Sequence, residues 1–120
     1  MAGGIVHVPW YATVFRADKL TAALEEIAPV AQRYGATWYA MHRSREDAYR
    51  IIQMTAMPSK EQWEAYWYGP EFSRFRAVSQ SLYQVPLLYA WHDLVLEGGL
   101  EQGNGLVEAQ RPTPAQTPGP

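Results

Sequence analysis

Apolar residues alternate with other positions in the first segment of the chain. The even positions Val6, Val8, Trp10, Ala12 and Val14 are uniformly apolar within a β-branched and aromatic stretch. This pattern predicts a strand over residues 5–15 with one buried face. A helical repeat of apolar residues follows, with Asp18 as its expected N-terminal cap and Gly35 as its stop. It predicts a helix over residues 18–34 that is kinked at Pro29.

The middle of the chain predicts a hairpin followed by an interrupted helix. Residues 36–42 and 48–57 have the composition of two strands joined by a charged turn. Ser59-Lys60-Glu61-Gln62 has the form of a capping box and marks the start of a second helix. Gly69-Pro70 interrupts this helix, and proline suits the first position of the piece that continues it.

The last apolar segment and the C-terminal residues differ sharply in composition. Residues 85–96 are apolar at almost every position, which predicts a fourth strand covered on both faces. Residues 97–120 lack aromatic side chains and are rich in glycine and proline, so they bury too little surface to offset chain entropy. We expect a globular domain over residues 1–96 and a Gly/Pro-rich C-terminal tail over residues 97–120.

The order of the predicted elements is β-α-β-β-α-β. This order is typical of the α+β, ferredoxin-like arrangement, in which helices cover one face of a four-stranded antiparallel sheet. The first and fourth strands are apolar on both sides, so the other face of the sheet needs a cover. We expect a second copy of the chain to pack its sheet against this face and form a homodimer.

Composition narrows the range of functions. The 10 basic and 12 acidic residues give a net charge of −2, which provides no basic surface for nucleic acid. No apolar run is long enough to span a bilayer, and the first residues lack the basic region of a secretory signal. The absence of cysteine excludes disulfides and thiolate chemistry. We expect a cytoplasmic protein, or one in a particle assembled there, that binds neither nucleic acid nor membrane.

Residues 56–72 carry a specific resemblance to a known family. They combine a strand end, a serine-capped helix, the aromatic pair Tyr66 and Trp67, and a following Phe72. In these features the chain resembles the dimeric α/β-barrel superfamily of antibiotic-biosynthesis monooxygenases, anthrone oxygenases and haem-degrading oxygenases, over roughly residues 5–96. The resemblance implies a barrel closed by two sheets and, if the chain is an enzyme, a cofactor-independent oxygenase or cyclase. Fold alone does not name the reaction.

The chain differs from this family at positions where the family has functional residues. The haem-degrading branch has a Trp where this chain has Tyr66, and a His where it has Arg76. The oxygenase branches use an Asn in the pocket, whereas the only Asn here is Asn104 in the predicted tail. The family mechanism therefore does not transfer residue by residue.

Aromatic side chains are the main candidates for a ligand site. The chain has 5 Trp, 8 Tyr and 3 Phe, and flat rings with a few polar groups suit a planar aromatic ligand. Packing in the core or at an interface is the alternative interpretation of the same rings. The residues predicted to contact such a ligand are Trp10, Gln53, Trp63, Trp67 and Phe72.

Three polar residues are predicted to act on a bound substrate: Tyr66, Arg76 and His7. Arg76 occupies the family's His position, where a guanidinium would hold a phenolate or carboxylate. Arg74 is two residues away and cannot share its helical face, so at most one of the two arginines points at a pocket. His7 has a suitable intrinsic pKa for a general base.

His7 and His92 lie on strands that are antiparallel neighbours in the predicted sheet, so their rings are expected to approach each other. A zinc ion would need a third ligand from Asp93 or His42, and the sequence has no compact ligand spacing. Satisfied strand histidines are the simpler interpretation. We therefore predict neither a metal nor a cofactor.

The sequence is compatible with two hypotheses of function. In the first, the chain is a homodimer that binds a small aromatic or polyketide-like compound and acts as a cofactor-independent monooxygenase. In the second, it is a non-catalytic structural subunit of a larger assembly, such as a virion or other multi-protein particle. The sheet face and residues 97–120 would then serve for packing against partners.

Overall fold

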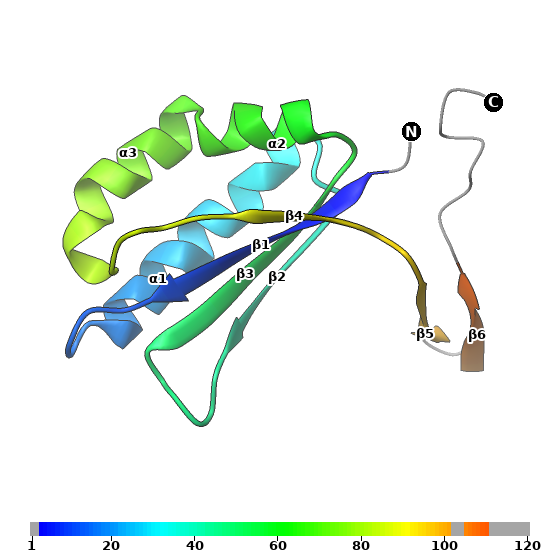
Figure 1. The fold of residues 1–120 in the computed structure, drawn as a ribbon, viewed down its shortest axis with the longest axis horizontal. Coiled ribbons are helices and arrows are strands. Elements are labelled where there is room, and N and C mark those ends of the chain that lie inside the picture. The colour runs from blue at the N-terminus through cyan, green and yellow to red at the C-terminus, as the bar shows by residue number, and fades with distance from the viewer. Residues whose placement is uncertain (1–2, 102–104, 111–120) are drawn as a thin grey trace.

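The protein folds as one four-stranded sheet covered by helices on one side. The computed structural model describes residues 3–101 and 105–110. The elements of the main body are β1 (Gly4–Tyr11), α1 (Ala17–Ile27), η1 (Ala28–Tyr34), β2 (Trp38–Arg43), β3 (Arg50–Met57), α2 (Lys60–Trp67), α3 (Pro70–Ser79), η2 (Gln80–Leu82) and β4 (Ala90–Asp93). The sheet is antiparallel in the order β2-β3-β1-β4, and the helices gather on one of its faces (Figure 1). The predicted α+β, ferredoxin-like arrangement is confirmed.

Alternation along the central strands creates the core. Successive side chains of a strand point to opposite faces, and on β1 the even positions Val6, Val8 and Trp10 are fully buried. The register places them opposite Thr55, Gln53 and Ile51 of β3, which are also buried. Leu20 and Leu24 of α1 pack on the same face with no exposed surface. Burial of side chains of this size contributes about 1.5–3 kcal/mol each.

The opposite face of the sheet, called the outer face below, carries the alternate residues. Its strand positions are Ile5, His7, Pro9, Tyr11, Trp38, Ala40, His42, Arg50, Ile52, Met54, Ala56, Ala90 and His92. These side chains are partly or fully exposed, and Trp38 has 45% of its surface accessible. In the single chain, the described residues leave this largely apolar face open.

The capping residue, Pro29 and Gly35 determine where the first helix begins, changes to a 3-10 helix and ends. The N-terminal cap position is Arg16, without a side-chain cap hydrogen bond, so the prediction that Asp18 is the cap is wrong. The Asp18 carboxylate lies in the first turn, near the positive end of the helix dipole, and accepts a 2.8 Å hydrogen bond from Arg43. The 3-10 helix η1 follows, with Pro29 near its start because proline lacks the N–H of an α-helical ladder. Gly35 ends it at φ 102°, as expected.

The second helix starts and breaks at the predicted residues. The Ser59 hydroxyl accepts a 3.1 Å hydrogen bond from the Gln62 backbone N–H and donates to the Gln62 side-chain oxygen. Gly69 separates α2 from α3, and a Cβ added there would clash with the Ala65 carbonyl oxygen. Among the described residues, none of the helices is long and apolar enough to cross a bilayer.

The first and last strands are shorter than predicted. β1 ends at Tyr11, because the next residues turn to hydrogen-bond with Ser81 and Leu82. In this turn Phe15 has a positive φ of 65° and is 90% exposed. β4 covers only Ala90–Asp93, and in the segment before it Leu88 is 70% exposed. The expectation of a long fourth strand covered on both faces is therefore wrong for the single chain.

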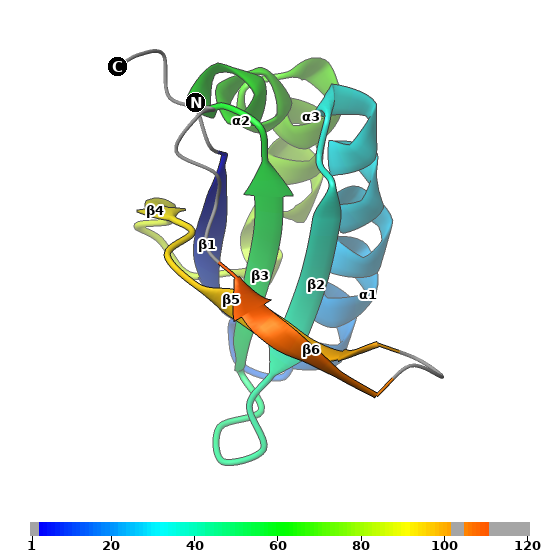
Figure 2. The ribbon, with the colours of Figure 1, turned by 90° about the vertical axis from the view of Figure 1, so that its right-hand side faces the viewer.

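The C-terminal residues include a second small sheet. β5 (Glu97–Glu101) pairs antiparallel with β6 (Gly105–Gln110), separately from the main sheet, and Figures 1 and 2 show this hairpin apart from the helical layer. Two parts of the predicted tail, residues 97–101 and 105–110, therefore form strands, while residues 102–104 and 111–120 lie outside the described residues. Composition missed the hairpin because backbone pairing requires no large side chains.

Candidate functional site

Five aromatic side chains form a packed cluster between the helices and the sheet. This ring cluster consists of Trp10 from β1, Trp63, Tyr66 and Trp67 from α2, and Phe72 from α3. The ring centres of Tyr66 and Phe72 are 5.0 Å apart at 86°, and those of Trp67 and Phe72 are 4.6 Å apart. Each ring has at most 5% of its surface exposed. The structure thus brings the predicted ligand-binding residues together, within a closed core.

A buried amide links two of these rings through hydrogen bonds. The Trp10 indole N–H donates to Gln53 Oε1 at 3.1 Å, and Gln53 Nε2 donates to the Tyr66 hydroxyl at 3.2 Å. The Tyr66 hydroxyl in turn donates to the Ile27 carbonyl at 2.7 Å. Burial raises the pKa of Tyr66, so its hydroxyl stays neutral at neutral pH and its one proton is already engaged. This geometry suits a positioning residue better than a general acid or base.

Arg76 lies against the edge of the ring cluster. Its guanidinium carbon is 4.8 Å from the Trp67 ring centre and 5.0 Å from that of Phe72, which is cation–π distance. Partial burial lowers the pKa of Arg76, although a guanidinium remains charged at neutral pH. This charge is available for an anionic group.

Three buried polar atoms among the described residues have no hydrogen-bond partner. They are Thr55 Oγ1, Trp63 Nε1 and Arg76 Nη1. Trp63 belongs to the ring cluster and Arg76 lies against it. Thr55 is two residues from Gln53 on β3, on the same face of the strand. An unpaired buried donor costs about 1–3 kcal/mol, and native proteins usually satisfy such groups with water or a ligand. A water molecule or a ligand acceptor would satisfy these groups.

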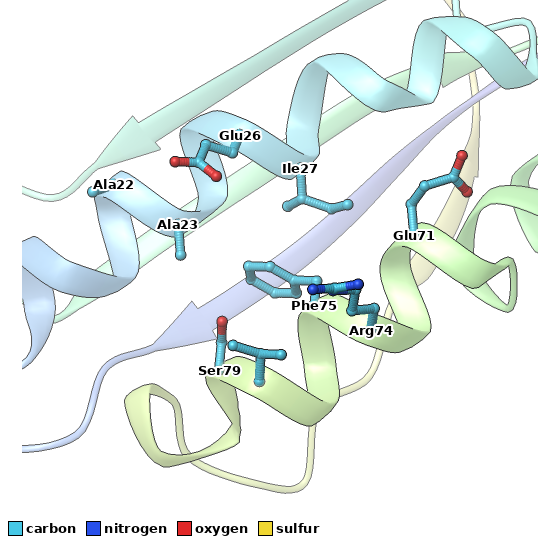
Figure 3. A pocket seen from close by; sticks show the side chains of 9 residues that line it. Ala22, Ala23, Glu26, Ile27, Glu71, Arg74, Phe75 and Ser79 are labelled. Carbon is cyan, nitrogen blue, oxygen red and sulfur yellow. The ribbon is translucent and has the colours of Figure 1, made fainter.

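A groove of about 520 Å³ lies between α1 and α3, beside the ring cluster (Figure 3). Phe75 lines the groove and contacts the rings of Trp10 and Phe72 at 5.6 and 5.4 Å. Figure 3 shows charged side chains around it from both helices. The groove is lined by Ala22, Ala23, Glu26, Ile27, Glu71, Arg74, Phe75, Val78 and Ser79. A single layer of side chains therefore separates the groove from the ring cluster.

Sequence reasoning missed the polar residues of this groove. Arg74 lines it, whereas Arg76 lies over Trp67, so the two arginines point to different places, as their spacing predicts. Glu26 and Glu71 also line the groove. Charged residues on amphipathic helices usually face solvent, and no local signal distinguishes them from residues at a groove.

His7 lies on the outer face of the sheet, away from Tyr66 and Arg76. It occupies an odd position of β1, opposite Met54, while the even positions face the helices. The structure therefore does not place His7 with its predicted catalytic partners in one chain. The His7 and His92 rings do approach each other, with centres 4.6 Å apart. No cluster of three His, Cys, Asp or Glu suited to a metal occurs among the described residues, and Asp93, opposite Gly4, projects to the helical side.

A tyrosine–glutamate pair at the α1–α3 groove gives a pH-dependent prediction. The Tyr34 hydroxyl donates to the Glu71 carboxylate, and this hydrogen bond is the main cause of the lowered pKa of Glu71. Tyr34→Phe should raise that pKa toward the ordinary range for glutamate. Because the folded-state pKa of Glu71 is depressed, the stabilisation is fully present above the ordinary pKa of glutamate and is lost as the pH falls through the lowered folded-state pKa. Carbon-13 NMR titration of the Glu71 carboxyl group measures the change.

Arg33→Gln is the matched control for this titration. The Arg33 guanidinium lies 3.6 Å from the Glu71 carboxylate and is largely exposed, so its contribution is screened by solvent. The pKa of Glu71 should rise less than in Tyr34→Phe. An equal or larger rise in Arg33→Gln would contradict the assignment of the hydrogen bond as the main cause.

Comparisons with known proteins show which solved structures have a similar fold. The sequence matches no protein-family model and no curated protein. A candidate antibiotic biosynthesis monooxygenase from Chloroflexus aurantiacus matches with a TM-score of 0.67 at 22% identity, over 85% of this chain and 100% of that chain. Another from Bordetella bronchiseptica has a TM-score of 0.70 at 15% identity, with coverage of 79% and 99%. A third, from Nitrosomonas europaea, has a TM-score of 0.69 at 12% identity, with coverage of 76% and 88%.

These structures share their fold with the present chain. The resemblance carried by residues 56–72 is therefore confirmed at the level of fold: the chain has the ferredoxin-like architecture of antibiotic-biosynthesis-monooxygenase-type proteins. At these sequence identities the likeness concerns architecture, and such architectures host unrelated chemistries.

Proposed function

We propose that the protein binds a small planar aromatic compound, polyketide-like and bearing a phenol or carboxylate, at Arg76 and the ring cluster. The observation that carries this proposal is the half-buried Arg76 guanidinium, which lies over two aromatic rings with Nη1 unpaired. A phenolate would accept from this nitrogen, and its ring would pack against Trp67. Charge-assisted hydrogen bonds of this kind are among the strong ones in proteins.

The entrance for such a ligand is the segment before β4. Tyr89 closes the ring cluster on this side, with its ring centre 5.4 Å from those of Trp63 and Trp67. Residues 85–89 make no strand pairing, so a displacement of Tyr89 breaks no sheet hydrogen bonds. Displacement would expose the unpaired Trp63 Nε1 to a ligand acceptor.

The reaction that fits this site is a cofactor-independent oxygenation. Arg76 would stabilise the phenolate or enolate of the substrate, and this electron-rich form would react directly with O₂. For an anthrone-like compound, the ring CH₂ loses both hydrogens and gains one oxygen atom, and the second oxygen atom leaves as water. The neutral Tyr66 is not a base, so ionisation would depend on the acidity that Arg76 confers on the substrate. The names of the structural neighbours as candidate monooxygenases support this class of chemistry.

Binding and turnover of a dihydroxyanthrone test the proposal in two steps. Tryptophan fluorescence follows anaerobic binding, and the absorbance of the quinone follows oxygenation after O₂ is added. Arg76→Met keeps an apolar stem but removes the charge, and it should weaken binding by about 10–100-fold, the equivalent of a charged hydrogen bond. Turnover should fall with it.

Arg74→Met is the matched control, because Arg74 lies on the same helix and lines the α1–α3 groove instead. Its binding constant should stay within a factor of two of the wild type. A ligand that is lost in Arg74→Met and kept in Arg76→Met would refute the site at Arg76. Failure of a panel of anthrones and quinols to bind would refute the ligand class.

We also propose that the protein is a homodimer joined through the outer face. Ile52 and Met54 are only partly covered in the single chain, and an open apolar face favours association. Ile52→Glu places a charge at the centre of this face and should yield a monomer in analytical ultracentrifugation. Val78→Glu, a substitution of a 74%-exposed residue on α3, should leave the dimer intact. A dimer that persists in Ile52→Glu would contradict this interface.

The separate hairpin β5–β6 favours a second candidate function. Within the part of the chain that the structure describes, this hairpin pairs with no other strand, which suits it to contact another chain. The protein would then be a non-catalytic subunit of a larger assembly that uses residues 97–120 as an arm. Truncation after Leu96 separates the candidates. Loss of higher assembly with ligand binding intact would support the arm, whereas unchanged assembly would argue against it.

A further inference from the structure

Two histidines on adjacent strands lie close enough together to bind one metal ion. His7 pairs with Ala90 and His92 pairs with Ile5, so the two imidazoles lie diagonally on the same outer face. Their ring centres are 4.6 Å apart, with an angle of 61° between the planes. For metal–nitrogen bonds of about 2.0–2.1 Å, ring centres lie roughly 4.5 Å apart at a right angle and about 5.2 Å apart at a tetrahedral angle. The observed separation falls within this interval.

Met54 on the neighbouring strand β3 carries a thioether and is the candidate for a third donor. Met54 of β3 pairs directly with His7, and directly opposed residues of antiparallel strands have Cβ atoms about 4.5–5.5 Å apart. The long, unbranched methionine side chain can reach over His7 toward His92. The other described methionines do not share this place, because Met41 and Met57 belong to the helical side of the sheet.

We propose that His7, His92 and Met54 form a copper(I) site on the outer face of the sheet. Three neutral ligands of which one is a thioether favour a soft, monovalent ion over hard divalent cations. The strand positions of the outer face include no Asp or Glu, so these positions offer no carboxylate ligand for such divalent ions. The site is separate from the proposed aromatic site, which lies on the other side of the sheet.

The two histidines of the proposed site differ in how far they are exposed. His7 is partly buried, and the ring of His92 lies beside it. His92 is exposed on β4, which is an edge strand of the sheet. An ion can therefore enter from the edge even when a second copy covers the centre of the face.

An anaerobic titration of the full chain with Cu(I), in competition with bicinchoninate, tests this site. We expect one Cu(I) per chain, with ring NMR signals of His7 and His92 shifting on binding while those of His42 stay in place. His7→Gln and His92→Gln should each weaken Cu(I) binding at least tenfold. Both substitutions are at partly or fully exposed positions, and thermal unfolding of the metal-free variants verifies that they fold.

Two further variants separate this site from unspecific binding. Met54→Leu preserves the volume of the side chain and should weaken Cu(I) binding about tenfold, with the weaker Zn(II) binding to the histidines unchanged, because thioethers select soft ions. His42→Gln alters the remaining histidine, which also lies on the outer face but on β2, and should have no effect. Cu(I) binding that survives both His7→Gln and His92→Gln, or that falls equally in His42→Gln, would overturn the proposal.

Discussion

Phe72→Ala should lower the free energy of unfolding by about 3–5 kcal/mol, which is typical for truncation of a buried phenylalanine. Phe72 has no exposed surface and sits at the centre of the ring cluster. Its ring contacts those of Trp10, Tyr66, Trp67 and Phe75. Large, stiff rings cannot collapse into the space it leaves, so most of the cavity term remains. Urea denaturation with a shared slope for wild type and variant measures the loss.

Phe15→Ala is the matched control for this prediction. The same chemical group is removed, but Phe15 is 90% exposed, and its positive φ is no easier for alanine than for phenylalanine. The change should stay within about 0.5 kcal/mol. A loss of less than 1 kcal/mol in Phe72→Ala would show that the ring cluster is loosely packed, and would favour a preformed pocket over a closed core.

The local patterns of the sequence predict most of the fold. Alternation in β1 identifies Val6, Val8 and Trp10 as buried, because a strand has only two faces and the helices cover one. The capping box at Ser59 and the interruption at Gly69 are also local features, set by a few backbone groups. Each of these follows from chemistry within about four residues.

Features that depend on distant contacts are not predicted. The length of β4 depends on where its pairing with β1 stops, and that pairing ends at His7 although β1 continues to Tyr11. The face on which His7 lies follows from strand register, so its separation from Tyr66 emerges only in three dimensions.

The sequence predicts which residues belong to the candidate site better than it predicts what each of them does. The aromatic residues around Tyr66 do converge, as their helical spacing indicates. The central hydrogen bonds of Gln53 join residues 43 and 13 positions apart, which no local motif reveals. Arg74 reaches the groove only because α3 packs beside α1, so its place depends on helix packing.

Tyr66→Phe should lower the free energy of unfolding by about 1–3 kcal/mol, because buried polar groups lose a partner. The hydroxyl donates to the Ile27 carbonyl and accepts from Gln53, so its removal leaves the Gln53 amide with an unpaired N–H. Tyr68→Phe is the control, since Tyr68 is 65% exposed at the end of α2, and its stability should not change. The double variant Tyr66→Phe/Gln53→Leu should lose less than the sum of its single changes, as residues in one network are coupled.

The same substitution distinguishes a positioning role for Tyr66 from a catalytic one. If the hydroxyl acted on substrate, Tyr66→Phe would lose turnover while its stability stayed near that of the wild type. The geometry predicts the reverse, because the only hydroxyl proton is donated to Ile27 and the raised pKa keeps it there. Anaerobic ligand binding measured below the unfolding transition should therefore remain within a factor of about three of the wild type, while Arg76→Met loses it. A variant that is fully stable yet inactive would instead place the Tyr66 hydroxyl at the reacting atoms.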